Sequence, residues 1–173
     1  AECWALHADA APAESRVSDV WRAAYLAGAG LVALEKEDGG LRPIAMGEVL
    51  RRLTGKLLCD HVKARARQTL WPLQTGCCSP LGAEATIHAV RQWTERNAQA
   101  SDKVLLKLDF ANAFNTLDRA AVLRAVRAHF PELERWARWT YETPSNLRFG
   151  KHRLASQAGV QQGDPLGPLF FSL

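Results

Sequence analysis

The sequence lacks several features that would assign it at once to a class of protein. No apolar run approaches the ~18 residues of a membrane-spanning helix; LAGAGLVAL at 26–34 is too short. The N-terminus has no charged segment followed by an apolar one, so it does not predict a secretory signal peptide. Apolar residues make up 47% and charged residues 23%, a composition that excludes disorder and predicts one domain with a core.

An initiator methionine is also missing, and the sequence ends within an apolar run. We therefore expect a piece of a longer chain. Cysteine is scarce, at four residues, and no two cysteines form a CxxC pair. This usage predicts reduced, buried thiols in an intracellular protein and does not distinguish the nucleus from other compartments. The spacing of Cys59, His61 and Cys77 argues against a zinc site.

Positive charge is concentrated in one stretch of the chain. The net charge is +4, yet residues 51–67 contain six cations and a single acidic residue. These cations are Arg51, Arg52, Lys56, Lys63, Arg65 and Arg67. Such a density suits binding to a polyanion, and a solvated helix face is the alternative.

Turn residues and apolar periodicity predict a hairpin and helices in the first half. Residues 1–30 read as a lead-in with a helix over 16–29. Asp38-Gly39-Gly40 separates two apolar runs, so 31–45 is predicted to be a β-hairpin, with Pro43 favouring an edge strand. Amphipathic helices are predicted over 46–68 and 85–98. The expected inward residues are Met46, Val49, Leu50, Leu53, Leu57, Leu58 and Val62 in the first helix, and Ile87, Val90 and Trp93 in the second.

The second half predicts a buried strand followed by helices and another hairpin. The nearly continuous apolar run at 104–108 is typical of a strand buried on both faces. Helices are expected over 116–130 and 133–141, with Pro131 between them, and a hairpin over 146–160 turns at Gly150. Asp164 and Pro165 are expected to be the N-cap and first residue of a last helix. This mixture predicts an α+β fold.

Several residues have a chemical and a structural reading. Asp109, at the end of the predicted strand, suits a Mg²⁺ ligand or a helix cap, and Phe114 suits a sugar-facing wall or the core. Lys36 and Arg42 flank the first turn, where they would clamp a triphosphate or remain solvated. The Gln162-Gly163 pair offers amide hydrogen bonds and close backbone approach, although glycine is common at helix starts.

The order of the motifs is more specific than any one of them. The chain contains RPIA at 42–45, LQTGCCSPLGAEATIHAV at 73–90, LDFANAF at 108–114 and GVQQGDPLGPLFFSL at 159–173. Together these segments resemble a reverse transcriptase of the non-LTR retrotransposon type, over about 31–173. The resemblance implies an incomplete right-hand polymerase fold. Its fingers would be about 31–102 and 143–160, and its palm about 103–142 and 161–173.

The same resemblance implies a function and roles for the candidate residues. Family members use Mg²⁺, as a pair of ions, to join deoxynucleoside triphosphates to a DNA primer on an RNA template. Asp109 and the Phe110 carbonyl would bind metal, Asp109 would be catalytic, and Phe114 would exclude a ribose 2′-OH. Lys36, Arg42, Gln162 and Gly163 would lie at the nucleotide, and the basic residues of 51–67 would bind nucleic acid. We expect Asp109, Phe114 and Gln162 to converge on one pocket.

The sequence also departs from the family pattern. Asn115 stands where the motif often ends in aspartate, and Cys77-Cys78 replaces an aromatic-basic pair. No Asp-Asp pair is present, although the family uses one to supply its other catalytic carboxylates. We therefore expect this piece to be inactive alone, with the remainder of the polymerase chain as its partner. A non-catalytic, nucleic-acid-binding remnant of a retroelement is the alternative.

Overall fold

The computed structural model describes residues 25–37 and 39–173, so most of the expected lead-in, Cys3 and the turn residue Asp38 lie outside the described residues. The described part combines helices with a four-stranded sheet of order β2-β1-β3-β4. The strands are β1 (Ala29–Glu35), β2 (Leu41–Gly47), β3 (Ser145–Phe149) and β4 (His152–Ser156). β1 runs antiparallel to β2 and parallel to β3, and β3 runs antiparallel to β4.

Both predicted hairpins are confirmed. Gly39 has a φ of +77° and Gly150 a φ of +56°, the left-handed conformation that such tight turns favour in glycine. β2 is an edge strand, as Pro43 indicated, because proline has no N–H to give to a further strand. The β1–β3 pairing joins segments more than a hundred residues apart in the chain, and no local pattern predicted it.

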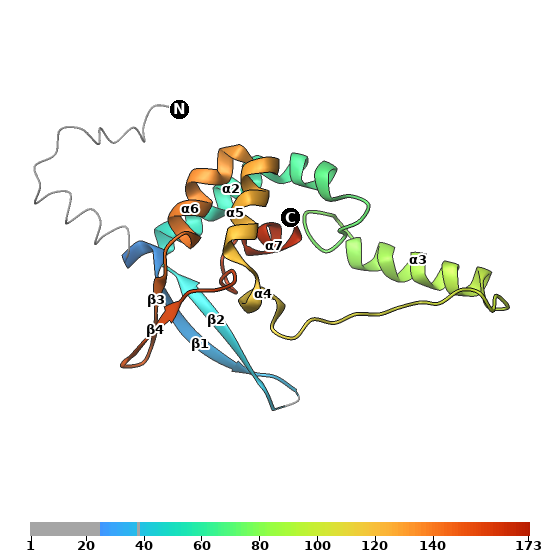
Figure 1. Ribbon diagram of the computed structural model, residues 1–173, viewed down its shortest axis with the longest axis horizontal. Helices are drawn as coiled ribbons and strands as arrows, with labels where there is room; N and C mark the ends of the chain where they lie inside the picture. The colour runs from blue at the N-terminus through green and yellow to red at the C-terminus, as the bar shows by residue number, and fades with distance from the viewer. Residues whose placement is uncertain (1–24, 38) are drawn as a thin grey trace, which may run out of the picture.

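The helices form one packed cluster and one separate arm. They are α2 (Val49–Leu70), α3 (Gly82–Arg96), α4 (Ala113–Thr116), α5 (Arg119–His129), a 3₁₀ turn (Pro131–Leu133), α6 (Glu134–Tyr141) and α7 (Gly167–Ser172). Figure 1 shows α2, α5, α6 and α7 grouped together, with α3 extending away from them. Within the described residues no helix is both apolar enough and long enough to span a bilayer.

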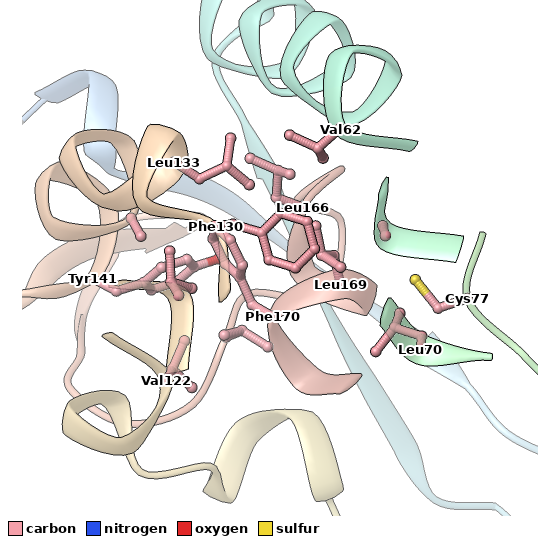
Figure 2. Close-up of a cluster of buried hydrophobic side chains, with 14 residues drawn as sticks. Val62, Leu70, Cys77, Val122, Phe130, Leu133, Tyr141, Leu166, Leu169 and Phe170 are labelled. Atoms are coloured by element: carbon pink, nitrogen blue, oxygen red, sulfur yellow. The ribbon is translucent and has the colours of Figure 1, made fainter. Parts of the chain in front are cut away.

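The hydrophobic core lies between α2, α5, α6 and α7. Val62, Ala66 and Leu70 of α2 belong to the same buried cluster as Val126 of α5. Figure 2 shows Phe130, Leu166 and Phe170 among the other side chains of this cluster. Leu166 and Phe170 belong to GVQQGDPLGPLFFSL, the last motif of the sequence. The start of α7 is therefore buried in the hydrophobic core.

The apolar run at 104–108 is not a buried strand, which corrects the prediction. Residues 103–110 carry no strand, and Val104 is 87% exposed. A continuous apolar strand is buried only when other strands flank it and helices cover both of its faces. The four described strands pair in a sheet of their own, and no described strand lies against 103–110.

The predicted inward faces of two helices are wrong at most positions. In α2, Val49, Leu50, Leu53 and Leu57 are exposed, whereas Val62 is buried and Leu58 packs against the core, as expected. Arg51 and Gly55 occupy the buried face instead, and Met46 lies in β2. In α3, the expected inward residues Ile87, Val90 and Trp93 are exposed, because α3 stands apart from the helical cluster.

The helices after Asp109 follow the prediction with shifted ends. The helix expected over 116–130 is observed as α5, after the short helix α4 ends at Thr116, and Asp118 caps α5 by accepting a hydrogen bond from the Ala121 N–H at 3.0 Å. Val122 and Val126 are buried, whereas Ala121 is exposed. The last helix begins at Gly167, so Pro165 precedes it and is not its first residue.

Candidate functional site

The loop between β4 and α7, residues 157–166, joins three of the sequence motifs. We call this segment the β4–α7 loop. The Val160 N–H donates to the Phe114 carbonyl at 2.8 Å, and the Gly159 N–H donates to the Leu117 carbonyl at 2.9 Å. On its other side, the Gln162 carbonyl accepts from the Ala45 N–H at 2.7 Å. The LDFANAF, RPIA and GVQQGDPLGP segments therefore meet at this loop.

Gly163 is a position where only glycine fits. Its φ is +114°, and a Cβ built on it would lie 2.5 Å from the Ala45 carbonyl oxygen. The adjacent Gln162 is half-buried. Its side-chain oxygen Oε1 is buried and accepts no hydrogen bond from any residue of the described chain. Gln162 and Gly163 therefore lie against the RPIA strand, with one amide oxygen still able to accept a hydrogen bond.

Arg51 lies at the centre of a buried polar cluster beneath this loop. It is 4% exposed. Its Nη1 donates to the Ala27 carbonyl at 2.7 Å and to Gln161 Oε1 at 2.8 Å, and its Nη2 lies 3.1 Å from Asp164 Oδ2. A side chain buried and paired in this way does not reach a phosphate in solvent. Its burial argues against the prediction that Arg51 binds nucleic acid.

Asp164 completes the cluster with Tyr141. The Tyr141 hydroxyl donates to Asp164 Oδ2 at 2.6 Å and accepts from the Gln161 N–H at 3.2 Å. Asp164 Oδ1 accepts from the Leu166 N–H at 2.9 Å, so Asp164 is a local cap, although α7 begins later than predicted. Burial and the neighbouring Asp164 charge raise the pKa of Tyr141 well above its ordinary value. The phenol therefore stays protonated and remains a donor.

A second arginine, Arg119, holds the start of the same loop, and the sequence analysis missed it. Its Nε donates to the Gly159 carbonyl at 2.8 Å and its Nη1 to the Ser156 carbonyl at 2.8 Å. Its guanidinium carbon lies 5.2 Å from the centre of the Tyr141 ring. Burial lowers the pKa of Arg119. The sequence shows only that Arg119 directly follows Asp118 at the start of a helix. That position does not predict a hydrogen bond to Gly159, forty residues away.

Phe114 contacts both the loop and α7. Its ring stacks on that of Phe171, with centroids 4.7 Å apart and an interplanar angle of 11°. Phe114 is half-buried and packs against the hydrophobic core. Asn112, with a φ of +52°, is the N-cap residue of the short helix α4 that carries Phe114. The core reading of Phe114 is thus correct in part, because the side chain is half-buried against the core.

Asp109 and Phe110 precede this contact on the exposed segment 103–110, where Phe110 is 71% exposed. Within residues 25–37 and 39–173, the Asp109 carboxylate makes no hydrogen bond or ion pair. The same residues hold no group of three or more His, Cys, Asp or Glu side chains suited to a metal ion. Phe114 contacts the loop that carries Gln162, whereas the convergence of Asp109, Phe114 and Gln162 on one pocket stays a prediction.

The two cations of the first hairpin flank its turn as predicted. Lys36 follows β1, and its N–H donates to the Gly40 carbonyl at 2.8 Å. Arg42 pairs with Leu34 across the β1–β2 ladder. Both side chains are exposed. They lie on the strand pair whose far end, at Ala45, contacts the β4–α7 loop.

The basic residues of α2 divide into two groups. Arg52, Lys56, Lys63 and Arg67 are exposed and available to a polyanion. Arg65 is also exposed, but it pairs within the fold, because its Nη1 lies 2.8 Å from Glu132 Oε1 and its Nη2 donates to the His129 carbonyl. Its guanidinium carbon also lies 4.7 Å from the centre of the Phe130 ring. The spacing of charges on α2 did not predict which of its cations pairs within the fold.

A cavity of about 300 Å³ opens at a different place in the fold. It is lined by Tyr25, Gly28, Ala29, Gly30, Glu48, Asn146, Arg148 and Arg153. None of the predicted site residues lines it. The residues that both the sequence and the geometry indicate lie on the β4–α7 loop and at its contacts.

Comparisons with known proteins agree with the motif order. Residues 34–173 match the family described as reverse transcriptase (RNA-dependent DNA polymerase). The chain is also 31% identical over 150 residues to the retrotransposable element SLACS 132 kDa protein of Trypanosoma brucei gambiense. That alignment covers 83% of this chain and 12% of the relative, so the chain spans a small part of that protein's length.

Proposed function

The chain belongs to the reverse transcriptase family, and on this premise we propose that it is part of an RNA-directed DNA polymerase of a retrotransposon. The complete polymerase would add deoxynucleotides to a DNA primer on an RNA template. In this proposal the fingers comprise residues of about 31–102 and 143–160, and the palm those of about 103–142 and 161–173.

One observation carries the proposal: backbone hydrogen bonds hold three motif segments around the β4–α7 loop. The Val160–Phe114 bond is 2.8 Å long and the Ala45–Gln162 bond 2.7 Å. The segments that they join are the ones expected to bind metal, triphosphate and nucleotide. This supports a shared nucleotide site at the loop, since residues that act on one substrate must lie near one another.

The roles assigned to the side chains follow from that placement. Arg42 and Lys36 are exposed cations that would neutralise the triphosphate, with Arg42 as the forked donor. The stack on Phe171 would hold the Phe114 ring where it excludes a ribose 2′-OH. Gln162 and Gly163 would face the nucleotide and template. Arg52, Lys56, Lys63 and Arg67 would follow a nucleic-acid backbone.

The residues of this chain do not by themselves fit the pair of Mg²⁺ ions that the family uses. The chain offers the Asp109 carboxylate and the Phe110 carbonyl, and among the described residues no cluster of carboxylates adds to them. Two dications ~4 Å apart repel each other strongly and need several carboxylates. We therefore propose that this chain supplies one metal-binding carboxylate, that of Asp109, and the groups that position the nucleotide. We expect it to extend no primer alone.

Primer extension by the complete parent protein tests the proposal. We expect the wild-type protein to copy an RNA template, and Asp109→Asn to reduce extension to background, because an amide is a far poorer ligand than a carboxylate. Asp102→Asn is the matched control, since it removes an exposed carboxylate directly before the same segment without touching the site. The 173-residue chain is expected to show no extension with Mg²⁺ or Mn²⁺.

Two outcomes would contradict this reading. Extension that survives Asp109→Asn would place the chemistry elsewhere. A folded wild-type parent protein that binds primer–template but never extends it would favour the nucleic-acid-binding remnant.

A further inference from the structure

We propose that the buried cluster of Arg51, Tyr141, Gln161 and Asp164 positions the β4–α7 loop for nucleotide binding. These are positioning residues, because they act through Gln162 and Gly163 and face the protein interior. The inference rests on the proposed function, since it assigns to a polymerase the device that fixes its nucleotide-facing loop.

The cluster holds the loop on both sides of the Gln162-Gly163 pair. On one side, the Gln161 N–H donates to the Tyr141 hydroxyl, and Gln161 Oε1 accepts from Arg51 Nη1 at 2.8 Å. On the other side, Asp164 accepts from Tyr141 at 2.6 Å and from Arg51 at 3.1 Å. The Gln162-Gly163 pair, which lies between Gln161 and Asp164, is therefore held in place by buried side chains that do not contact the substrate.

Arg51 also connects the loop to the fingers sheet. Its Nη1 donates to the Ala27 and Gly28 carbonyls, at 2.7 and 3.3 Å, directly before β1. A planar guanidinium fixes the direction of every hydrogen bond that it makes. The end of β2 is shaped to admit this side chain, because a Cβ on Gly47 would lie 3.2 Å from Arg51 Cδ. One side chain thus sets the loop relative to the hairpin that carries Lys36 and Arg42.

Stability alone does not account for this cluster. Arg51 is 4% exposed, Asp164 8% and Tyr141 1%. A buried ion pair is often no more stabilising than apolar side chains of similar volume, because both charges lose their hydration. Apolar side chains would hold α2 against the loop, but they would leave the rotation of the loop undetermined. Directional hydrogen bonds to Gln161 and Asp164 determine it, which is what a nucleotide-facing turn requires.

Tyr141→Phe in the complete protein is the most selective test. The change removes the hydroxyl that joins Gln161 to Asp164, while the ring can keep its edge contact with Phe170, whose centroid is 6.1 Å away. We expect the KM for the deoxynucleoside triphosphate to rise roughly 10-fold, short of the ~100-fold cost of misplacing a reacting group by about 1 Å. The KM for primer–template is expected to stay at the wild-type value.

Hydrogen exchange supplies a readout that does not depend on activity. Amides of the β4–α7 loop are expected to exchange faster in Tyr141→Phe, whereas those of α5 keep the wild-type rate. Tyr25→Phe is the control, since Tyr25 is the other tyrosine of the chain and is half exposed. Arg51→Lys keeps the positive charge but loses the branched guanidinium. In this variant too, the loop amides should exchange faster and the KM for the deoxynucleoside triphosphate should rise.

The outcomes separate the two proposals. Unchanged loop exchange and unchanged KM in Tyr141→Phe would overturn the positioning role. Faster exchange throughout the chain would do the same, because it would indicate a general loss of stability. A wild-type protein that extends no primer would overturn the proposed function, and loop exchange would still decide whether the cluster orders the loop.

Discussion

Replacing Gly159 by alanine should be among the most destabilising small changes in this chain. Gly159 has a φ of +67°, and a Cβ at this position would lie 2.3 Å from the Phe114 carbonyl oxygen and 2.5 Å from the Asn115 carbonyl carbon. Both neighbours are backbone atoms of α4, so they cannot rotate away as a flexible side chain would. The loop and α4 must therefore separate for alanine to fit.

The size of the effect follows from the contacts that would be lost. A residue other than glycine in the left-handed region costs about 1–2 kcal/mol. Separation would also strain the bonds from Gly159 to Leu117, at 2.9 Å, and from Val160 to Phe114, at 2.8 Å. Each neutral bond contributes about 0.5–1.5 kcal/mol, and a charged donor such as Arg119 contributes about 1.5–3 kcal/mol. Because some bonds would re-form, we expect a loss of about 3–5 kcal/mol of unfolding free energy.

Gly150→Ala provides the matched comparison. Gly150 has a φ of +56°, and a Cβ there would meet no atom within 4 Å, so only the backbone strain of about 1–2 kcal/mol applies. Urea unfolding followed by far-ultraviolet circular dichroism would give both values, provided the slopes agree. Equal losses for the two variants would refute the close approach of the loop to α4.

Two further predictions concern pH and salt. Burial raises the pKa of Cys59 to about 11 and, together with the Cys78 thiol, that of Cys77 to about 12, so both stay protonated above pH 9. Unfolded thiols ionise near pH 9, so the unfolding free energy should be intact below that pH and fall as pH rises above it. Replacing Arg52, Lys56 and Lys63 by glutamine should lower the slope of log affinity for nucleic acid against log salt by about one unit per lost contact.

Each of these predictions has its own control. The double variant Cys59→Ser, Cys77→Ser should weaken the alkaline loss of stability, and an unchanged pH profile would assign that loss to other groups. Arg138→Gln removes an exposed cation that pairs with Glu142 at 2.7 Å on α6, so it should leave the salt slope unchanged. If the triple variant also leaves it unchanged, nucleic acid binds elsewhere.

Local chemistry explains what could be predicted from the sequence. The two hairpins follow from glycines that accept a positive φ, and the edge position of β2 follows from Pro43. The order of RPIA, LDFANAF and GVQQGDPLGP identified the family, which the match over residues 34–173 supports. Each of these signals lies within a few residues, so the sequence alone was sufficient for them.

Only the tertiary structure decided which polar groups are buried and which apolar groups are not. Arg51 and Arg52 are neighbours of the same type, yet Arg51 is buried because Ala27, Gln161 and Asp164 converge on it. The run at 104–108 has the composition of a buried strand but is exposed, because no described strand lies beside it. Whether a residue is buried depends on which other segments pack against it. Hydrophobic periodicity describes only the pattern of apolar residues within one segment.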